Sequence, residues 1–292
     1  MYDKDRGKGD GAVILRDRII RDLDSIPSLP TAAIKTIRLL QDTEVSIAEL
    51  ARTIEYDPSL TTNLLHLANS AYFGASRQID SVRQAIIRLG TNNLFRLVVA
   101  SAVVPLAHQP VRGYDLSAGE LWIHSIAVAL CSDLMRAELG LSTPSFMFTS
   151  ALLHNIGKVV LGNCEYVEPQ KILDMAVSHN VSFDEAELAV LGIDHAEVGA
   201  LLLDRWNFPQ NIIEVVRWHH YPNNYPDEKI VIDLVHVSDN LCMKTGIGIG
   251  VDGLKHRVSQ ESLSRLKLST DIAEHVLIGT MENLSDFRNM LN

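Results

Sequence analysis

The segment LLHLANSAYFGASRQIDSVRQAIIRLGTNNLFRLV, residues 64–98, holds the clearest local signals for how this chain folds. Asp57 and Pro58 precede it and supply a cap and a first-turn proline for a helix that runs through Asn69. Ser81 begins a second helix that ends near Gly90, and the next residue begins a third. The segment therefore predicts three consecutive helices with short connections.

Similar helix signals extend outward from this segment to both ends of the chain. Strand signals are almost absent, because no alternating apolar run is bounded by Asn-Gly or Asp-Gly turns. The prediction is an all-α, multi-helix bundle of about a dozen helices. The remaining start signals and apolar-periodic segments are residues 12–23, Pro30 to Leu40, the capping box at 46–49, a capping box at 117–120 opening a helix to about Leu139, Thr143 with Pro144, 182–185, 194–197, Pro209, 230–243 and 271–291.

Composition narrows the class of protein. A chain of 292 residues that is 47% hydrophobic can bury a large core and is too apolar for general disorder. A net charge of -10 without a dense Lys/Arg run argues against nucleic-acid binding. The first ten residues carry no signal peptide, and the most apolar stretch, residues 97–107, is shorter than the roughly 20 residues that span a bilayer. Three separated cysteines form no CxxC pair and predict reduced thiols, namely Cys131, Cys164 and Cys242. We expect a cytoplasmic protein that binds neither nucleic acid nor membrane.

Potential metal ligands follow one another along the second half of the chain. Glu120 and His124 are four residues apart, so they would share one face of a helix. Glu120 is also the last residue of the capping box at 117–120, so capping alone is the alternative for it. The complete series is Glu120, His124, His154, His195, His219, His220 and Asp239.

His154 lies in ALLHNIGKVVL, residues 151–161, which predicts a buried helix with Lys158 one turn further along the same face. An isolated histidine there would be a hydrogen-bonded core residue, but this one is not isolated. His195 follows Asp194 at a helix start, where the positive helix end should lower the pKa of the imidazole. That position suits a metal ligand or a phosphate contact, with an exposed first-turn histidine as the alternative.

His219 and His220 would point about 100° apart on a helix, so both can serve one site only if it lies between them or holds two ions. Asp239 lies in the apolar segment VHVSDNL, where a carboxylate needs a partner. That partner could be a metal, a helix amide or a histidine such as His236, one turn before it. Imidazole and carboxylate ligands suit Fe, Mn, Zn or Ni, and nothing indicates an organic cofactor.

Asn155 interrupts this pattern. It follows His154 directly, at the position where a bridging carboxylate would hold two ions about 3.5–4 Å apart. A neutral amide oxygen can still contact one ion, but it bridges two cations poorly and does not offset their charge. Binding of one or two ions and catalysis by a pair of ions are therefore separate questions.

The chain resembles the HDOD domain, the HD-related output domain of bacterial signalling proteins, within the superfamily of HD phosphohydrolases. The resemblance covers roughly residues 20–225 and is carried by residues 64–98, by SIPSLPTAAIKTIRLL (25–40) and by SIAELARTIEYDPSLT (46–61). It implies an HD-like helical bundle and a regulatory role. We expect a flexible tail at 1–11, an HDOD domain at 12–226, and a helical segment at 227–292 packed on that domain.

The order of the ligands is similar to that of HD-GYP phosphodiesterases, which cleave cyclic di-GMP. Lys158 falls where those enzymes carry a lysine, which makes it a candidate phosphate contact. Asn155 replaces the aspartate of their HD pair. The segment HHYPNNYP, residues 219–226, keeps the double histidine but lacks the acidic and glycine positions of their GYP loop.

These observations lead to three hypotheses. The first is a bacterial regulatory HDOD protein that acts in trans on signalling proteins, with a homodimer as a further option. It keeps a residual site for one or two metal ions, with Asn155 among the residues around them, but is not a competent phosphodiesterase. The second is an active metal-dependent phosphohydrolase on a cyclic dinucleotide or nucleotide. The third is a scaffold whose histidines satisfy one another without metal.

Overall fold

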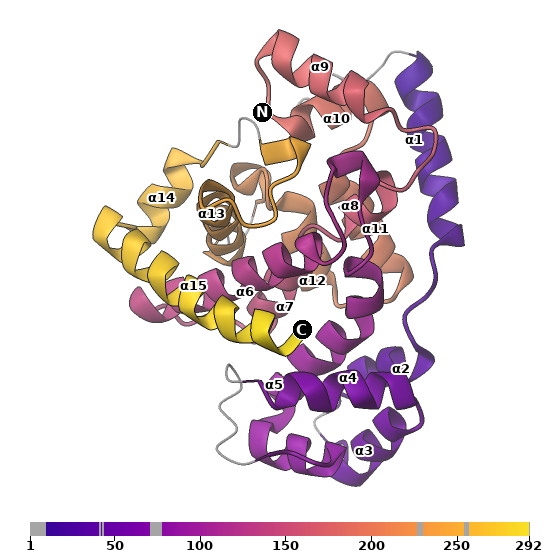
Figure 1. The fold of residues 1–292 in the computed structure, drawn as a ribbon, viewed down its shortest axis with the longest axis vertical. Helices are drawn as coiled ribbons and strands as arrows, with labels where there is room; N and C mark the ends of the chain where they lie inside the picture. The colour runs from indigo at the N-terminus through magenta and orange to yellow at the C-terminus, as the bar shows by residue number, and fades with distance from the viewer. Residues whose placement is uncertain are drawn as a thin grey trace.

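The computed structural model describes residues 10–40, 42, 44–70, 78–226, 230–253 and 257–291, and the regular elements within them are helical. An isolated antiparallel bridge joins Val111 to Leu116 and is the only strand-like pairing found in these residues. The all-α prediction is confirmed. The helices labelled in Figure 1 are α1 (Asp10–Asp22), α2 (Thr31–Leu39), α3 (Ile47–Glu55), α4 (Pro58–Ala68), α5 (Val82–Ala107), α6 (Glu120–Glu138), α7 (Met147–Leu153), α8 (Gly157–Leu161), α9 (Pro169–His179), α10 (Phe183–Leu191), α11 (His195–Arg205), α12 (Gln210–Trp218), α13 (Ile230–Lys244), α14 (Gln260–Leu266) and α15 (Thr270–Leu291). Short 3-10 turns are η1 (Leu23–Ser25), η3 (Arg112–Tyr114), η4 (Pro222–Asn224) and η5 (Val251–Gly253).

Helices α2 to α5 form one lobe, at the bottom of Figure 1, in which α5 packs against α2, α3 and α4. We call it the N-terminal lobe, and α6 to α15 the C-terminal lobe. Helix α1 leaves the first lobe and packs on α10 in the second. Tyr166 donates a hydrogen bond to Asp22 at 2.7 Å, and Arg205 donates to Asp24 at 3.0 Å, so side chains of the C-terminal lobe hold the end of α1 and the turn that follows it.

Local sequence signals account for several helix starts. The side chains of Ser46, Asp57 and Ser81 accept hydrogen bonds from backbone amides in the first turns of α3, α4 and α5, as N-caps do. Gly90 has a φ of 75° and a ψ of 171°, which breaks α5 where the sequence places a helix end. Ser182 with Glu185 forms the predicted capping box. These boundaries were predictable because each depends on residues only a few positions apart.

Three boundary predictions were wrong. Helix α6 begins at Glu120 itself, because Gly119 takes the cap position with a φ of 84°. Helix α7 begins at Met147, three residues beyond Pro144, and α12 ends at Trp218, before the two histidines that the sequence placed on it. Of the predicted tail, residues 1–9 lie outside the described residues, while residues 10 and 11 belong to α1.

Helix α6 is the centre of the C-terminal lobe. It is apolar around most of its circumference, as expected of a helix covered on all sides, and α7, α13 and α15 pack around it. Val276, Thr280 and Leu284 of α15 are buried, while Ile278 and Met281 remain exposed. The segment after residue 229 therefore packs directly on the helix that carries His124.

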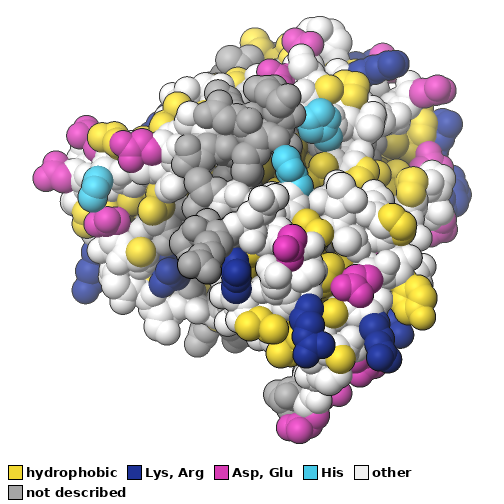
Figure 2. Space-filling view, turned by 60° about the horizontal axis from the view of Figure 1, so that its bottom comes forward, with side chains coloured by type: hydrophobic (Ala, Val, Ile, Leu, Met, Phe, Trp, Pro, Cys, Tyr) yellow, Lys and Arg dark blue, Asp and Glu magenta, His cyan; other side chains and the backbone are white. Residues whose placement is uncertain are grey.

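Among the described residues, α5 is the one helix with the length and apolar composition to cross a membrane. Only 44% of its most apolar window is buried, but Gly90 divides the helix, and the part that follows is shorter than about 20 residues. Its packing against α2, α3 and α4 is that of a core helix. On the face shown in Figure 2, acidic and basic side chains are interspersed.

A close approach between α8 and α11 generates the first prediction. A Cβ atom on Gly157 would lie 2.0 Å from the carbonyl oxygen of His195 and 2.6 Å from the amide nitrogen of Gly199. Because backbone atoms cannot move aside as a side chain can, we expect Gly157→Ala to lower the free energy of unfolding by about 3 kcal/mol in a urea titration. Gly11→Ala is the control, since no atom lies within 4 Å of its added Cβ. Equal stability of the two variants would contradict this close packing.

Candidate metal centre

Six of the predicted ligands converge in the C-terminal lobe as two adjoining groups. Atoms of His124, His154 and Asp239 all lie within 4.8 Å of one another, and we call these residues the Asp239 group. The same limit defines the His220 group, which consists of His195, His219 and His220. The two groups adjoin, because the ring centroids of His154 and His219 are 5.1 Å apart. All six are buried except His220, which is half-buried.

Five helices bring these side chains together. His124 lies in the second turn of α6, and Asp239 lies on α13, which packs against α6. His154 immediately follows α7, His195 begins α11, and His219 immediately follows α12. Three of the ligands therefore sit at helix ends, which lets them approach one another more closely than residues in mid-helix.

Hydrogen bonds that Nδ1 donates to backbone carbonyls fix the orientation of three imidazole rings. The Nδ1 atoms of His154 and His219 each lie 2.7 Å from a backbone carbonyl oxygen one turn earlier, and Nδ1 of His124 lies 3.0 Å from the carbonyl oxygen of Ile247. A carbonyl only accepts, so each Nδ1 must carry the hydrogen. In a neutral ring, Nε2 then has a lone pair. This is the arrangement that outer-shell partners impose on metal-binding histidines.

Asp239 faces two of these lone pairs. Its Oδ1 lies 3.0 Å from Nε2 of His124 and 3.5 Å from Nε2 of His154. A carboxylate and an imidazole lone pair repel each other unless a proton or a metal cation lies between them. Two atoms that each lie 2.0–2.2 Å from one ion, at angles between octahedral and tetrahedral, are about 2.8–3.6 Å apart. Both observed distances fall in that range.

Further buried atoms lack a partner among the described residues, which supports the fit to a metal. Nε2 of His154 and Nε2 of His219 make no hydrogen bond there, and neither does the Oδ1 or the Nδ2 of Asn155. Buried polar atoms are rarely left unsatisfied unless water or an ion meets them. The donor set therefore fits a transition-metal ion, and Asn155 lies beside it with its amide available.

The protonation states also suit a cation. Burial lowers the pKa of His154, and burial lowers the pKa of His219 well below its usual value, so both rings are neutral near pH 7. Burial would raise the pKa of Asp239, but hydrogen bonds from His124 and His154, which these rings donate only when Nε2 carries a proton, hold it well below the usual value. An ionised carboxylate and neutral imidazoles are the forms that bind metal.

His195 contradicts two expectations. It is only 1% exposed, so the exposed first-turn alternative was wrong. Burial acts to lower the pKa of His195, but the carboxylate of Glu187 outweighs it, and the pKa is raised instead of lowered. Oε2 of Glu187 lies 2.7 Å from Nδ1 of His195 and also accepts from its backbone amide. Reasoning from the helix end failed because it left out this carboxylate.

Glu187 itself was missed. It is fully buried on α10, and its second oxygen accepts a hydrogen bond from the hydroxyl of Tyr114. A continuous chain of close polar contacts therefore runs from Glu187 through His195 to His220. The Nε2 atoms of the two histidines are 2.8 Å apart. The one signal in the sequence is a lone acidic residue within the apolar run AELAVL, residues 186–191.

Two candidates are not brought into the centre. Glu120 accepts a hydrogen bond from the backbone amide of Ser117 and joins neither group, which agrees with its capping alternative. His236 is not the partner of Asp239: its Nδ1 donates to the carbonyl oxygen of His219, and its Nε2 accepts from the amide of Ser259. His236 is therefore a support for the backbone beside the His220 group.

Lys158 is buried, and it does not present a free ammonium for a phosphate. Its Nζ donates to Oδ2 of Asp252 at 2.6 Å and lies 5.6 Å from the centre of the Tyr114 ring. Burial acts to lower the pKa of Lys158, but the charges of Asp252 and Asp239 raise it overall. The lysine is thus charged and already paired within the chain.

Asp252 belongs to a segment, IGIGVDG at residues 247–253, that lies against the centre; we call it the closing segment. Its first residue supplies the carbonyl oxygen that orients His124. A Cβ on Gly248 would lie 2.6 Å from Cβ of His124, and one on Gly250 would lie 2.0 Å from the carbonyl oxygen of Tyr114. The two glycines allow the backbone to approach this closely.

A cavity of about 1010 Å³ borders the centre at His220. His220 lines it together with Tyr221, Asn223, His179 and Arg257. The His220 group is therefore the part of the centre that a small molecule can approach.

Glu187→Gln is a test of how the centre is supported. An amide cannot accept from both Tyr114 and His195 as the carboxylate does, so His195 should lose its fixed orientation. Outer-shell changes of this kind lower metal affinity by roughly 10–100-fold, and we expect a loss in this range when chelator-stripped protein is titrated with Zn²⁺. Glu168→Gln is the matched control, because that carboxylate is 62% exposed. An unchanged affinity would remove Glu187 from the support of the centre.

Comparisons with known proteins identify relatives in sequence and in fold. A relative from Treponema pallidum (strain Nichols), named only as an uncharacterized protein, is 27% identical over 218 residues, which are 74% of this chain and 41% of that protein. This chain thus spans less than half the length of that relative. An HDOD domain protein of unknown function from Geobacter sulfurreducens has a TM-score of 0.69 and 27% identity, covering 92% of this chain and 90% of its own. A protein from Shewanella amazonensis SB2B, provisionally named a phosphohydrolase, has a TM-score of 0.69 and 25% identity. The match covers 92% of this chain and 97% of that protein.

The family follows from the sequence match together with these folds. Residues 26–222 match the model of the HDOD domain, which confirms the resemblance seen in residues 25–40, 46–61 and 64–98. The chain belongs to the HDOD family.

Proposed function

We propose that this protein is a regulatory HDOD protein that binds a transition-metal ion at the Asp239 group and acts through contacts with signalling proteins in trans. One observation carries the metal proposal: hydrogen bonds donated by Nδ1 to backbone carbonyls leave the Nε2 atoms of His124 and His154 facing Asp239, with the buried Nε2 of His219 in the adjoining group. A core that only satisfied its own histidines would leave fewer Nε2 atoms without a partner.

The ligand set favours one ion over two. Imidazoles with one carboxylate suit Fe, Mn, Zn or Ni, and a bound ion of this kind would supply Lewis-acid chemistry to a water or phosphate oxygen. Asp239 is the one carboxylate in the two groups, so it alone offsets the charge of a cation. Asn155 adds no charge where a bridging carboxylate would stand. We expect the His220 group to bind a second ion more weakly.

Two features argue against efficient phosphodiester cleavage. Asn155 cannot bridge two ions, so the pair of metals that stabilises both the attacking and the leaving oxygen is not well held. Lys158 is paired with Asp252 at 2.6 Å and is not free to contact a phosphate. Both features weaken hydrolysis but leave metal binding intact. This combination supports a domain that regulates other proteins by contacting them.

Elemental analysis tests the metal proposal. We expect protein purified without added metal to hold about one equivalent of Fe, Mn, Zn or Ni, and His154→Ala to lose most of it because a central ligand is gone. His275→Ala is the matched control, since that histidine on α15 is 70% exposed and lies outside both groups. Parent protein without stoichiometric metal, even after incubation with these ions, would support the scaffold hypothesis instead.

A metal-dependent phosphohydrolase is the second candidate, favoured by the large cavity that ends at His220. Asn155→Asp tests whether the residue beside His154 limits the centre to one ion. Restoring a carboxylate beside His154 should raise the bound metal from about one equivalent to about two, because a bridging ligand and a negative charge are added.

Turnover is then measured with cyclic di-GMP and bis(p-nitrophenyl) phosphate. We expect none from the parent protein. Turnover by the parent that His154→Ala abolishes would overturn the regulatory assignment in favour of hydrolysis, whatever the Asn155→Asp variant does.

A further inference from the structure

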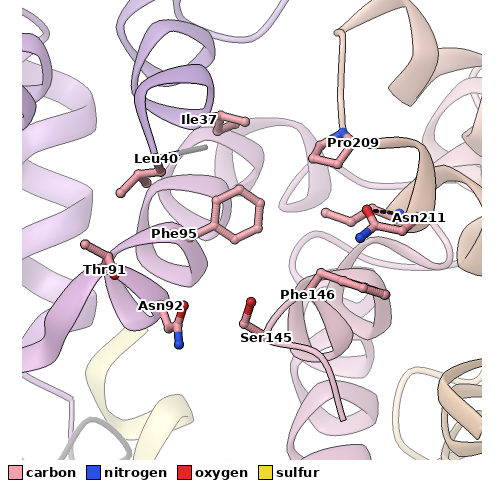
Figure 3. Close-up of a pocket in the computed structure, with 10 residues that line it drawn as sticks. Ile37, Leu40, Thr91, Asn92, Phe95, Ser145, Phe146, Pro209 and Asn211 are labelled. Carbon is pink, nitrogen blue, oxygen red and sulfur yellow. Dashed lines mark hydrogen bonds between the residues drawn. The ribbon is translucent and has the colours of Figure 1, made fainter. Parts of the chain in front are cut away.

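A second cavity, of about 300 Å³, lies between the two lobes and shares no lining residue with the metal centre (Figure 3). Helices α2 and α5 form one of its sides, through Ile37, Leu40 and Phe95. The start of α7 and the start of α12 form the other, with Phe146 and Pro209. Segments distant in the sequence thus enclose it.

The cavity has an apolar wall and polar groups at its edges. The ring of Phe95 lies against the space, and the hydroxyl of Ser145 points into it (Figure 3). The amides of Asn92 and Asn211 and the hydroxyl of Thr91 supply further hydrogen-bonding groups. Among the residues that the structure describes, none that lines the cavity carries a charge, although 21% of the residues of the chain are charged.

The lining defines the chemistry of an occupant. A charged group that enters without a counter-charge loses hydration and gains no ion pair, so the neutral lining selects against ions. An aromatic ring can pack against Phe95, and amides and hydroxyls can meet its polar substituents. The volume is at the lower end of ligand pockets, which hold about 300–1,000 Å³.

We propose that this cavity binds a small uncharged molecule that has one aromatic ring and an amide or hydroxyl group. The site is distinct from the metal centre and does not require the centre to hold metal. A protein partner is the less favoured occupant, because the cavity has a volume of only about 300 Å³ and its described lining offers no charge for a complementary surface.

Two helices join the cavity to the metal ligands. Phe146 is the N-cap of α7 and His154 its C-cap, while Pro209 is the N-cap of α12 and His219 its C-cap. If the centre binds metal, which is the proposed function, an occupant that shifts either helix would change metal affinity, and metal would change the affinity for the occupant by the same factor. This consequence rests on the proposed function, whereas occupancy of the cavity does not.

Saturation-transfer NMR on the intact, chelator-stripped chain tests the site, with benzamide, phenol and benzyl alcohol as neutral probes and benzoate as the charged counterpart of benzamide. We expect at least one neutral probe to bind, and benzoate to bind at least about ten-fold more weakly than benzamide or not at all. Failure of all three neutral probes, or equal binding of benzamide and benzoate, would overturn the proposal.

Two pairs of variants locate the binding. Ser145→Phe fills the cavity from an exposed position, and Ser142→Phe places the same ring three residues earlier, also exposed and outside the lining. We expect the first to weaken the best probe at least about ten-fold and the second to leave it unchanged. Asn92→Ala and its neighbour Asn93→Ala are the second pair, because only Asn92 lines the cavity. We expect the first of these to weaken probe binding and the second to leave it unchanged.

Equal binding by both members of both pairs would contradict the assignment. A change in sedimentation coefficient caused by Ser145→Phe or Asn92→Ala, without probe binding to the parent, would assign the cleft to a contact between copies and also overturn it. Metal content is measured on the same samples, so loss of probe binding and absence of metal are separate results.

Discussion

The structure of the C-terminal lobe depends on how the carboxylate of Asp239 is accommodated. A charge that is 2% exposed costs several kcal/mol unless a partner meets it. Here two imidazoles, from α6 and from the end of α7, face it at 3.0 and 3.5 Å. Helix α13 can therefore pack against α6 only in the register that places Asp239 between His124 and His154. The same register places the closing segment, which follows α13, over the centre.

How much was predictable depends on the distance along the chain between interacting residues. The caps at Ser46, Asp57 and Ser81 lie beside their partners, so their helices could be located from sequence. The order of the histidines and of Asp239 was recognisable because each stands out from an apolar helix. Asp252 was not found because its partner Lys158 is 94 residues away, and Glu187 was not found although His195, one of its two partners, is only 8 residues away.

The same reasoning explains the errors at individual residues. The raised pKa of His195 reflects a carboxylate that helix geometry alone does not include. Glu120 was ambiguous because capping and metal binding use the same side chain, and the local contact to Ser117 is the one observed. Lys158 was assigned to an external phosphate because no sequence pattern shows that residue 252 reaches it. Long-range partners decided the outcome at these residues, whereas the starts of α6 and α7 and the end of α12 were local predictions that failed.

Asn155 separates two properties that are usually found together. The geometry around Asp239 suits one cation, whereas the charge and bridging capacity for two are reduced. A site of this kind can contribute stability through ligand binding, since whatever binds the folded state alone raises the free energy of unfolding. Metal availability would then alter how rigid the lobe is, without any reaction taking place.

The position of the closing segment has a consequence for modularity. The family match ends at residue 222, yet Asp239, the carbonyl of Ile247 and Asp252 all lie beyond it. A fragment that ends at that boundary would contain all five histidines of the two ligand groups. It would lack the carboxylate of Asp239 and the carbonyl of Ile247 that orients His124. A fusion or exchange of domains that is meant to keep the candidate metal centre therefore has to include residues 230–253. The centre extends beyond the stretch that the HDOD model matches.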